Sequence, residues 1–186
     1  MAISTADFKN GKAILIDDKP YVIIEFQHVK PGKGGAFVRT KVRDVRTGRV
    51  NDLTFRSGEK FDEVRMEQRE MQFLYSDSDE YYFMDTETYD QMTLDVAVVG
   101  DAAKWLREND LATMQYAGDE LIGVEAQMFV ELEVVDTEPG FKGDTVQGGN
   151  KAATLETGAV INVPMFINNG DVLRVDTRDG RYITRV

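Results

Sequence analysis

The stretch Lys30-Pro31-Gly32-Lys33-Gly34-Gly35-Ala36 joins two runs, residues 21–29 and 37–45, that have the apolar and β-branched composition of strands. Pro31 fixes its own φ and biases the residue before it toward an extended backbone, and the three glycines tolerate positive φ. The stretch therefore predicts the tip of a β-hairpin with Lys33 at its apex. These residue types fit a solvated connector, and they also fit a cationic probe that reaches into an anionic or RNA-lined pocket.

The strand that follows this tip is basic on one face. Side chains alternate between the two faces of a strand, so the basic set and the apolar set point in opposite directions. The basic set is Arg39, Lys41 and Arg43, and it alternates with Val38, Thr40 and Val42. This stripe lies beside the loop that carries Lys33, and it indicates either an RNA-facing surface or the exposed face of an edge strand.

The rest of the first 64 residues consists of short apolar runs broken by turn residues. Strands are expected at residues 13–16, 21–29, 36–45 and 50–55, and short strands with tight turns predict a small barrel. Residues 57–70 are highly charged and are expected to be locally helical at best, with the first domain boundary near residue 64.

Residues 65–127 predict a second barrel of the oligonucleotide-binding (OB) type. Strands are expected at residues 71–75, 81–84, 92–94, 114–116 and 121–124. One helix is expected over residues 101–108 with Asp101 as its N-cap. A single helix beside five strands matches the proportions of an OB-type barrel.

Residues 128–186 predict a third unit, also all β. Strands are expected at residues 128–135, 158–167 and 171–176, with residues 136–153 forming a loop. Arg178-Asp179-Gly180 predicts a hairpin turn into a last strand at residues 182–186.

Charge is distributed unevenly along the chain. The net charge is −11, and it divides into +3 for residues 1–64, −11 for residues 65–128 and −3 for residues 129–186. An acidic middle limits non-specific binding of RNA while a mildly basic amino-terminal part allows a local contact. An acidic surface that only confers solubility explains the same numbers.

The residue types leave little material for catalysis. The chain has one histidine, His28, and no cysteine, so thiolate metal sites and most nucleophilic triads are excluded. His28 is expected to be half-buried and hydrogen-bonded. The glycine-rich residues 140–151 match neither the Walker pattern nor the dinucleotide-binding pattern. Neither a signal peptide nor a membrane span is visible in the sequence. We expect a cytoplasmic protein without catalytic residues, metal or cofactor and without membrane association.

Several segments resemble the bacterial elongation factor P family, in the family's own order. They are Lys30-Pro31-Gly32-Lys33-Gly34 before Ala36-Phe37-Val38-Arg39, Gly143-Asp144-Thr145, Lys151 to Gly158, Ile161 to Ile167 with Gly170, and Asp176-Thr177-Arg178 to Tyr182 and Arg185. Gly35 and Ala152 stand where many members have a polar residue and a proline.

The resemblance implies three small β-barrels in an elongated, L-shaped, tRNA-like arrangement. These are an SH3/KOW-like barrel at residues 1–64, which carries the tip lysine, and two OB-fold barrels at residues 65–127 and 128–186. The implied function is that of a monomeric, non-enzymatic translation elongation factor, which binds both ribosomal subunits between the peptidyl-tRNA and exit sites. There it would contact the peptidyl-tRNA and relieve stalling at consecutive prolines.

The resemblance also implies roles for particular residues. Lys33 matches the position that a modifying enzyme extends with β-lysine or aminopentanol, within the loop Lys30, Pro31, Gly32, Gly34 and Gly35. Arg39, Lys41 and Arg43 would contact tRNA or ribosomal RNA. Contacts to the exit-site codon and small subunit would involve Gly143, Asp144, Thr145, Gly148, Gly149, Lys151, Tyr182 and Arg185. The alternatives are a general single-stranded RNA-binding OB protein and a diverged paralogue of the family.

Overall fold

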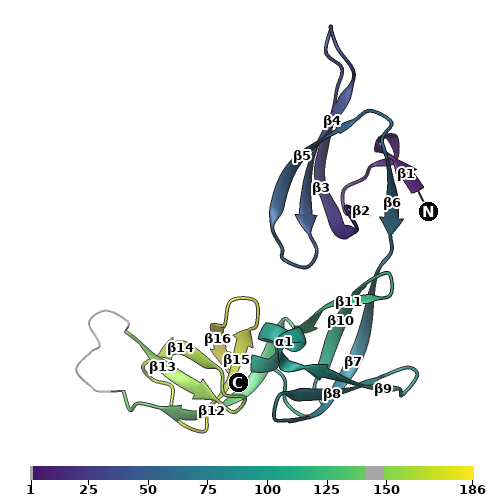
Figure 1. Ribbon diagram of the computed structural model, residues 1–186. Coiled ribbons are helices and arrows are strands. Elements are labelled where there is room, and N and C mark those ends of the chain that lie inside the picture. Colours follow the sequence, from purple (N-terminus) through teal and green to yellow (C-terminus); the bar gives the residue numbers. More distant parts are fainter. Residues whose placement is uncertain (1, 141–148) are drawn as a thin grey trace. The chain divides into compact units, whose positions relative to one another are not determined.

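The computed structural model describes residues 2–140 and 149–186, and these residues form three antiparallel β-sheets with very little helix (Figure 1). The predicted all-β fold class is confirmed. Two compact units result, one of Met1–Gln68 with Gln115–Gly123 and the other of Arg69–Met114 with Val124–Val186. The boundaries at residues 64 and 127 remain predictions.

The first sheet has six strands in the order β1-β6-β2-β3-β4-β5 and curls around an aromatic and aliphatic core. That core includes Phe8, which follows a short 3-10 helix, η1 (Thr5–Asp7), and packs edge-on against Phe55. The strands are β1 (Ala2–Ser4), β2 (Ala13–Ile16), β3 (Lys19–Val29), β4 (Phe37–Asp44), β5 (Val50–Arg56) and β6 (Lys60–Val64). The expectation for residues 57–70 is wrong, since they contain β6 and the start of β7. Most of their charged side chains are exposed, and buried and exposed residues alternate only in part along these two strands.

The second sheet has five strands in the order β11-β10-β7-β8-β9. They are β7 (Met66–Asp77), β8 (Glu80–Asp85), β9 (Gln91–Asp95), β10 (Leu111–Ala117) and β11 (Glu120–Ala126). The predicted helix is wrong in position. The α-helix α1 is Val96–Val99, and its N-cap is Asp95, which accepts a hydrogen bond from the Ala97 amide at 2.7 Å. Gly100, at φ +60°, ends α1 and begins a 3-10 helix, η2 (Gly100–Lys104).

The third sheet has five strands in the order β14-β13-β12-β15-β16, and its edge strands β14 and β16 lie side by side, so the sheet closes on itself. The strands are β12 (Phe129–Thr137), β13 (Asn150–Leu155), β14 (Val160–Pro164), β15 (Val172–Asp176) and β16 (Arg181–Arg185). The expectation of a loop over residues 136–153 is wrong at both ends, because β12 continues to Thr137 and β13 begins at Asn150. Trp105, directly after η2, packs into the core of this third sheet with Leu132, Leu155 and Ile161.

Candidate functional site

The long hairpin of β3 and β4 carries the predicted tip, and in Figure 1 it extends beyond the other strands of its sheet. The ladder pairs Val29 with Phe37, so residues 30–36 form the loop. Lys33 is exposed, and within residues 2–140 and 149–186 its amine has no hydrogen-bond or ion-pair partner. The hairpin therefore presents a free cation, as the sequence predicts.

Only one of the three tip glycines is required by the backbone. Gly34 has φ +110°, a conformation that other L-residues rarely adopt. Gly32 and Gly35 lack a positive φ, and a Cβ added to either would meet nothing within 4 Å. The fold of the loop itself therefore does not explain these two glycines.

Beside the tip, β4 confirms the predicted alternation. Val38, Thr40 and Val42 are buried, whereas Arg39 and Arg43 are exposed and Lys41 is half-buried. The three basic side chains therefore share the outer face of the sheet.

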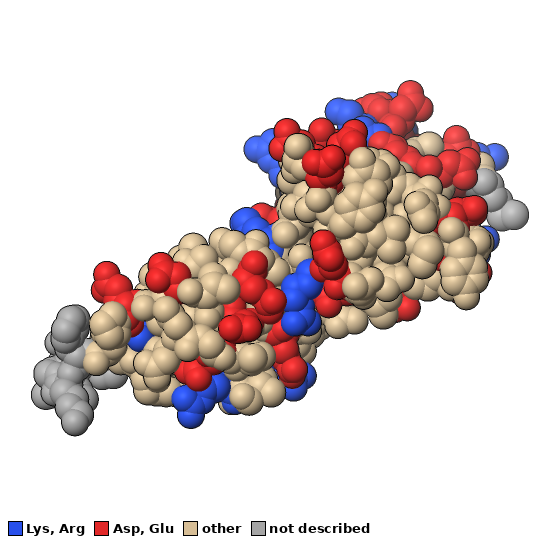
Figure 2. Space-filling view, turned by 90° about the horizontal axis from the view of Figure 1, so that it is seen from below, with Lys and Arg blue, Asp and Glu red and all other residues tan. Residues whose placement is uncertain are grey.

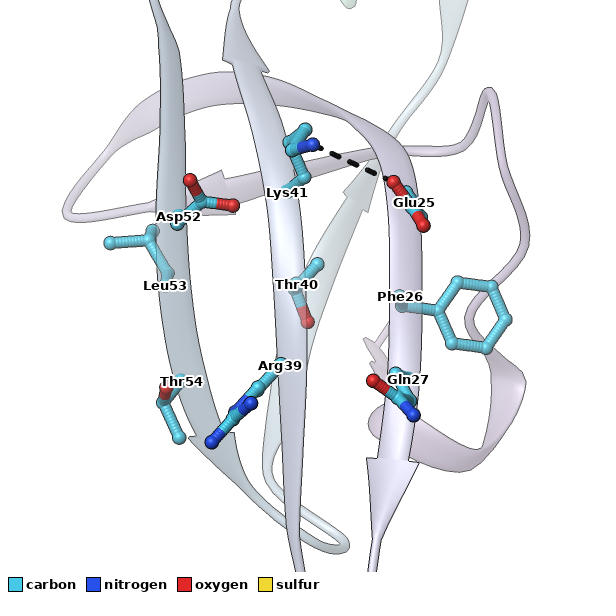
Figure 3. Close-up of a pocket in the computed structure, with 9 residues that line it drawn as sticks. All are labelled: Glu25, Phe26, Gln27, Arg39, Thr40, Lys41, Asp52, Leu53 and Thr54. Carbon is cyan, nitrogen blue, oxygen red and sulfur yellow. Dashed lines mark ion pairs between the residues drawn. The ribbon is translucent and has the colours of Figure 1, made fainter.

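The register across β3, β4 and β5 gives these basic residues different neighbours (Figure 3). Lys41 lies between Glu25 and Asp52, and its Nζ is 3.6 Å from Glu25 Oε2. An exposed pair at this distance contributes little stability, but it offsets the charge locally. Sequence alternation alone missed these two acids because cross-strand neighbours depend on register, and the bulge between Ile23 and Glu25 shifts that register.

Arg39 lies between two neutral side chains, Gln27 and Thr54, on the same face. Its guanidinium carbon is 5.7 Å from the ring centroid of Phe37, a cation–π arrangement. Residues 25–27, 39–41 and 52–54 of these three strands line a shallow hollow of about 380 Å³. Of the three predicted contacts, Arg39 is therefore available to an external anion, whereas Lys41 is partly compensated by carboxylates.

The structure describes only some of the carboxy-terminal candidates. Gly143, Asp144, Thr145 and Gly148 lie outside the described residues. Gly149 precedes β13, where an added Cβ would contact Met165 at 3.8 Å. Lys151 is buried and donates a hydrogen bond to the backbone carbonyl of Glu138. Its amine is therefore directed at the protein. An RNA contact would need the amine to face solvent.

The two candidates in β16 are also tied to the protein. Tyr182 is half-buried against the core of the third sheet. The Arg185 guanidinium lies 3.5 Å from Asp171 Oδ2 and 5.5 Å from the ring centroid of Phe166. Arg185 keeps about half of its side chain exposed, at 49%.

A two-pronged ion pair next to the β15–β16 turn was missed by sequence reasoning. Arg178 donates two hydrogen bonds to the buried carboxylate of Asp176, at 2.9 and 2.6 Å, and its own amide donates a third at 3.0 Å. These bonds, chiefly the side-chain ones, lower the pKa of Asp176 from 3.8 to about 2. The pair fixes the β15–β16 turn, so the segment Asp176-Thr177-Arg178 has a structural explanation.

The expectation for His28 is wrong, because its ring is exposed and lies edge-on to Phe26, with 5.7 Å between centroids. Within the part of the chain that the structure describes, no group of three or more metal-ligating side chains occurs. Nor does any helix of those residues have the length and apolar character to cross a membrane. The hairpin site supplies positive charge and a stacking surface, which are means of binding an anion.

Comparisons with known proteins match this architecture along nearly the whole chain. Three family models match: "Elongation factor P (EF-P) KOW-like domain" at residues 4–61, "Elongation factor P (EF-P) OB domain" at 66–124 and "Elongation factor P, C-terminal" at 130–185. Elongation factor P of Pelotomaculum thermopropionicum is 58% identical over 185 residues, covering 99% of this chain and 100% of the relative. The same factor of Thermoanaerobacter sp. is 54% identical over 184 residues, covering 99% of this chain and 100% of the relative.

Two solved structures share the fold. One is "Eukaryotic translation initiation factor 5A from Methanococcus jannaschii", with TM-score 0.52 and 21% identity, covering 68% of this chain and 92% of that one. The other is a translation initiation factor eif-5a family protein from Naegleria fowleri, with TM-score 0.56 and 17% identity, covering 67% and 97%.

The fold and the domain matches define a translation factor built from a KOW-like barrel followed by OB-type domains. Within that class, the chain belongs to the elongation factor P family and is a translation elongation factor. The predicted family and fold class are thereby confirmed.

Proposed function

We propose that the protein binds the ribosome between the peptidyl-tRNA and exit sites and relieves stalling at consecutive prolines. The observation that carries the proposal is Lys33, an exposed amine without an ion-pair partner among the described residues, at the end of a long hairpin. Proline constrains φ and restricts the geometries in which its amine attacks the peptidyl ester. A cation held against the acceptor end of the peptidyl-tRNA would reduce the entropy cost of reaching a productive geometry.

The chain would act by positioning, leaving peptide-bond chemistry to ribosomal RNA, so the protein needs neither a catalytic residue nor a cofactor. Arg39 and Arg43 are exposed beside the hairpin and would contact phosphates of the acceptor arm. Lys41, between Glu25 and Asp52, would contribute less. The partners are the two ribosomal subunits and the peptidyl-tRNA, and the working form is a cytoplasmic monomer.

The proposed domains are residues 1–64, 65–127 and 128–186. The carboxy-terminal barrel would approach the exit-site codon with the segment around Gly143, Asp144 and Thr145, and the small subunit with Arg185. The buried amine of Lys151 favours a structural role for that residue.

We expect a modifying enzyme to extend Lys33, because the glycines on both sides leave the amine accessible. Fragmentation mass spectrometry of the loop peptide from natively expressed protein tests this step. An added mass on Lys33 supports it, and an unmodified lysine in active protein removes the need for modification.

The function itself is tested in reconstituted translation with the modified full-length protein. Lys33→Ala should slow synthesis through three consecutive prolines and leave synthesis from a proline-free message unchanged. The unfolding midpoint should not change, because the Lys33 side chain is exposed. Lys60→Ala, which removes another exposed lysine of the first sheet, is the control and should behave as wild type. Equal slowing of both messages, or no slowing of either, would overturn the proposal.

A further inference from the structure

A pair of stacked tyrosines lies on the outer face of the second sheet. Tyr75 of β7 and Tyr82 of β8 are direct cross-strand partners, with ring centroids 4.5 Å apart and planes inclined by 17°. Tyr75 is 47% exposed, a large value for an aromatic side chain in mid-sheet. The inward face of the same strands packs Phe73 against Phe83, so the tyrosines are not needed to fill the core.

A row of three carboxylates borders this pair. Asp77, Glu80 and Asp95 are paired across β7, β8 and β9, two residues along each strand from the row Tyr75, Tyr82 and Thr93. Side chains two residues apart on a strand share a face, so the acids lie beside the rings. All three acids are exposed.

The carboxylates are held in place without being neutralised. The Tyr82 hydroxyl donates a hydrogen bond to the Glu80 carboxylate at 2.9 Å, and the Asp95 carboxylate accepts one from the Ala97 amide at 2.7 Å. Among the residues that the structure describes, none of the three forms an ion pair with a lysine or arginine. Residues 65–128 have a net charge of −11, and Figure 2 shows acidic side chains spread widely over one face of the molecule, with basic ones fewer among them.

We propose that Tyr75 and Tyr82, together with the row Asp77, Glu80 and Asp95, form a docking platform for an arginine-rich segment of a partner protein. An arginine guanidinium stacks on an aromatic face while its N–H groups donate to carboxylates, and the platform offers both in adjacent rows. The acidic row disfavours a nucleic acid, although bases also stack on tyrosines. The platform does not depend on the proposed action of Lys33.

The experiment is an NMR titration of the full-length protein with penta-arginine, penta-lysine and deca-uridylate. We expect penta-arginine to shift the ring resonances of Tyr75 and Tyr82 and to bind several-fold more tightly than penta-lysine. Tyr75→Ser should weaken penta-arginine binding about fivefold, as expected for the loss of one cation–π contact. Tyr89→Ser is the matched control: Tyr89 is more exposed, at 70%, but lies outside the platform, so its replacement should leave the affinity unchanged.

Two further variants separate stacking from charge. Tyr75→Phe should keep the affinity because it retains the ring, and Glu80→Gln should lower both the affinity and its salt dependence. Equal affinity for the two cationic peptides, or an unchanged affinity in Tyr75→Ser, would overturn the proposal. Binding of deca-uridylate that shifts the same rings would overturn it in favour of a nucleic-acid surface.

Discussion

Replacement of Trp105 by alanine should destabilise the second compact unit, Arg69–Met114 with Val124–Val186, by about 4 kcal/mol. Trp105 follows η2 in the sequence, yet it is only 7% exposed within the core of the third sheet. A Cβ added at Gly180 would lie 3.5 Å from its ring, so the side chain reaches the β15–β16 turn. Burial of about 200 Å² at about 25 cal/mol per Å² gives about 5 kcal/mol as an upper estimate.

The assay is urea unfolding followed by far-ultraviolet circular dichroism, with amide hydrogen exchange in β13 and β14 as a local readout. Trp105→Phe is the control and should lose less than half as much, since the smaller ring still fills part of the site. A loss below about 1.5 kcal/mol in Trp105→Ala, or unchanged exchange in β13 and β14, would refute the view that this side chain joins η2 to the third sheet.

Three further predictions concern the backbone and buried polar groups. The Asp176 carboxylate, with its pKa lowered from 3.8 to about 2 by Arg178, stabilises the fold fully above the unfolded-state pKa and loses that contribution as the pH falls from about 4 to about 2. The unfolding free energy of Asp176→Asn, measured between these pH values, should therefore fall less steeply than that of wild type, and parallel curves would contradict this. Gly34→Ala should lower the unfolding free energy by about 1 kcal/mol because Gly34 has φ +110°, whereas Gly32→Ala should change it by no more than about 0.5 kcal/mol. Urea unfolding measures both variants, and equal losses would refute the strain argument. Thr40→Val should raise the unfolding free energy by about 1 kcal/mol because the buried Thr40 Oγ1 has no hydrogen-bond partner in the described part of the chain, and a destabilised variant would show that the hydroxyl is satisfied.

Sequence reasoning succeeded where alternation and turn chemistry agree. β4 alternates regularly between inward and outward side chains, and a glycine-rich turn precedes it, so the hairpin and its basic face were predictable. In β3, by contrast, the consecutive residues Gln27 and His28 are both exposed. β6 and β13 were missed because charged or small residues occupy their exposed positions, and only pairing with β2 and β12 makes them strands.

The misplaced helix has a similar cause. Asp95 and Asp101 are both plausible N-caps, and the choice depends on the end of β9, which the sequence does not mark. The different charge environments of Arg39 and Lys41 depend on the register of β3 and β5 against β4. The burial of Lys151 depends on the backbone carbonyl of Glu138, 13 residues away in the sequence. Contacts of this kind follow from tertiary pairing and have no local signal.

The most direct test of the central claim is photo-cross-linking from position 33. The full-length protein with a photoreactive group on a cysteine introduced by Lys33→Cys would be bound to ribosomes that are stalled on consecutive prolines. The account predicts cross-links to the acceptor end of the peptidyl-tRNA, and a probe at the exposed residue 60 of β6 should give none there. Cross-links from position 33 only to other ribosomal components, or none at all on stalled ribosomes, would contradict the role of the tip.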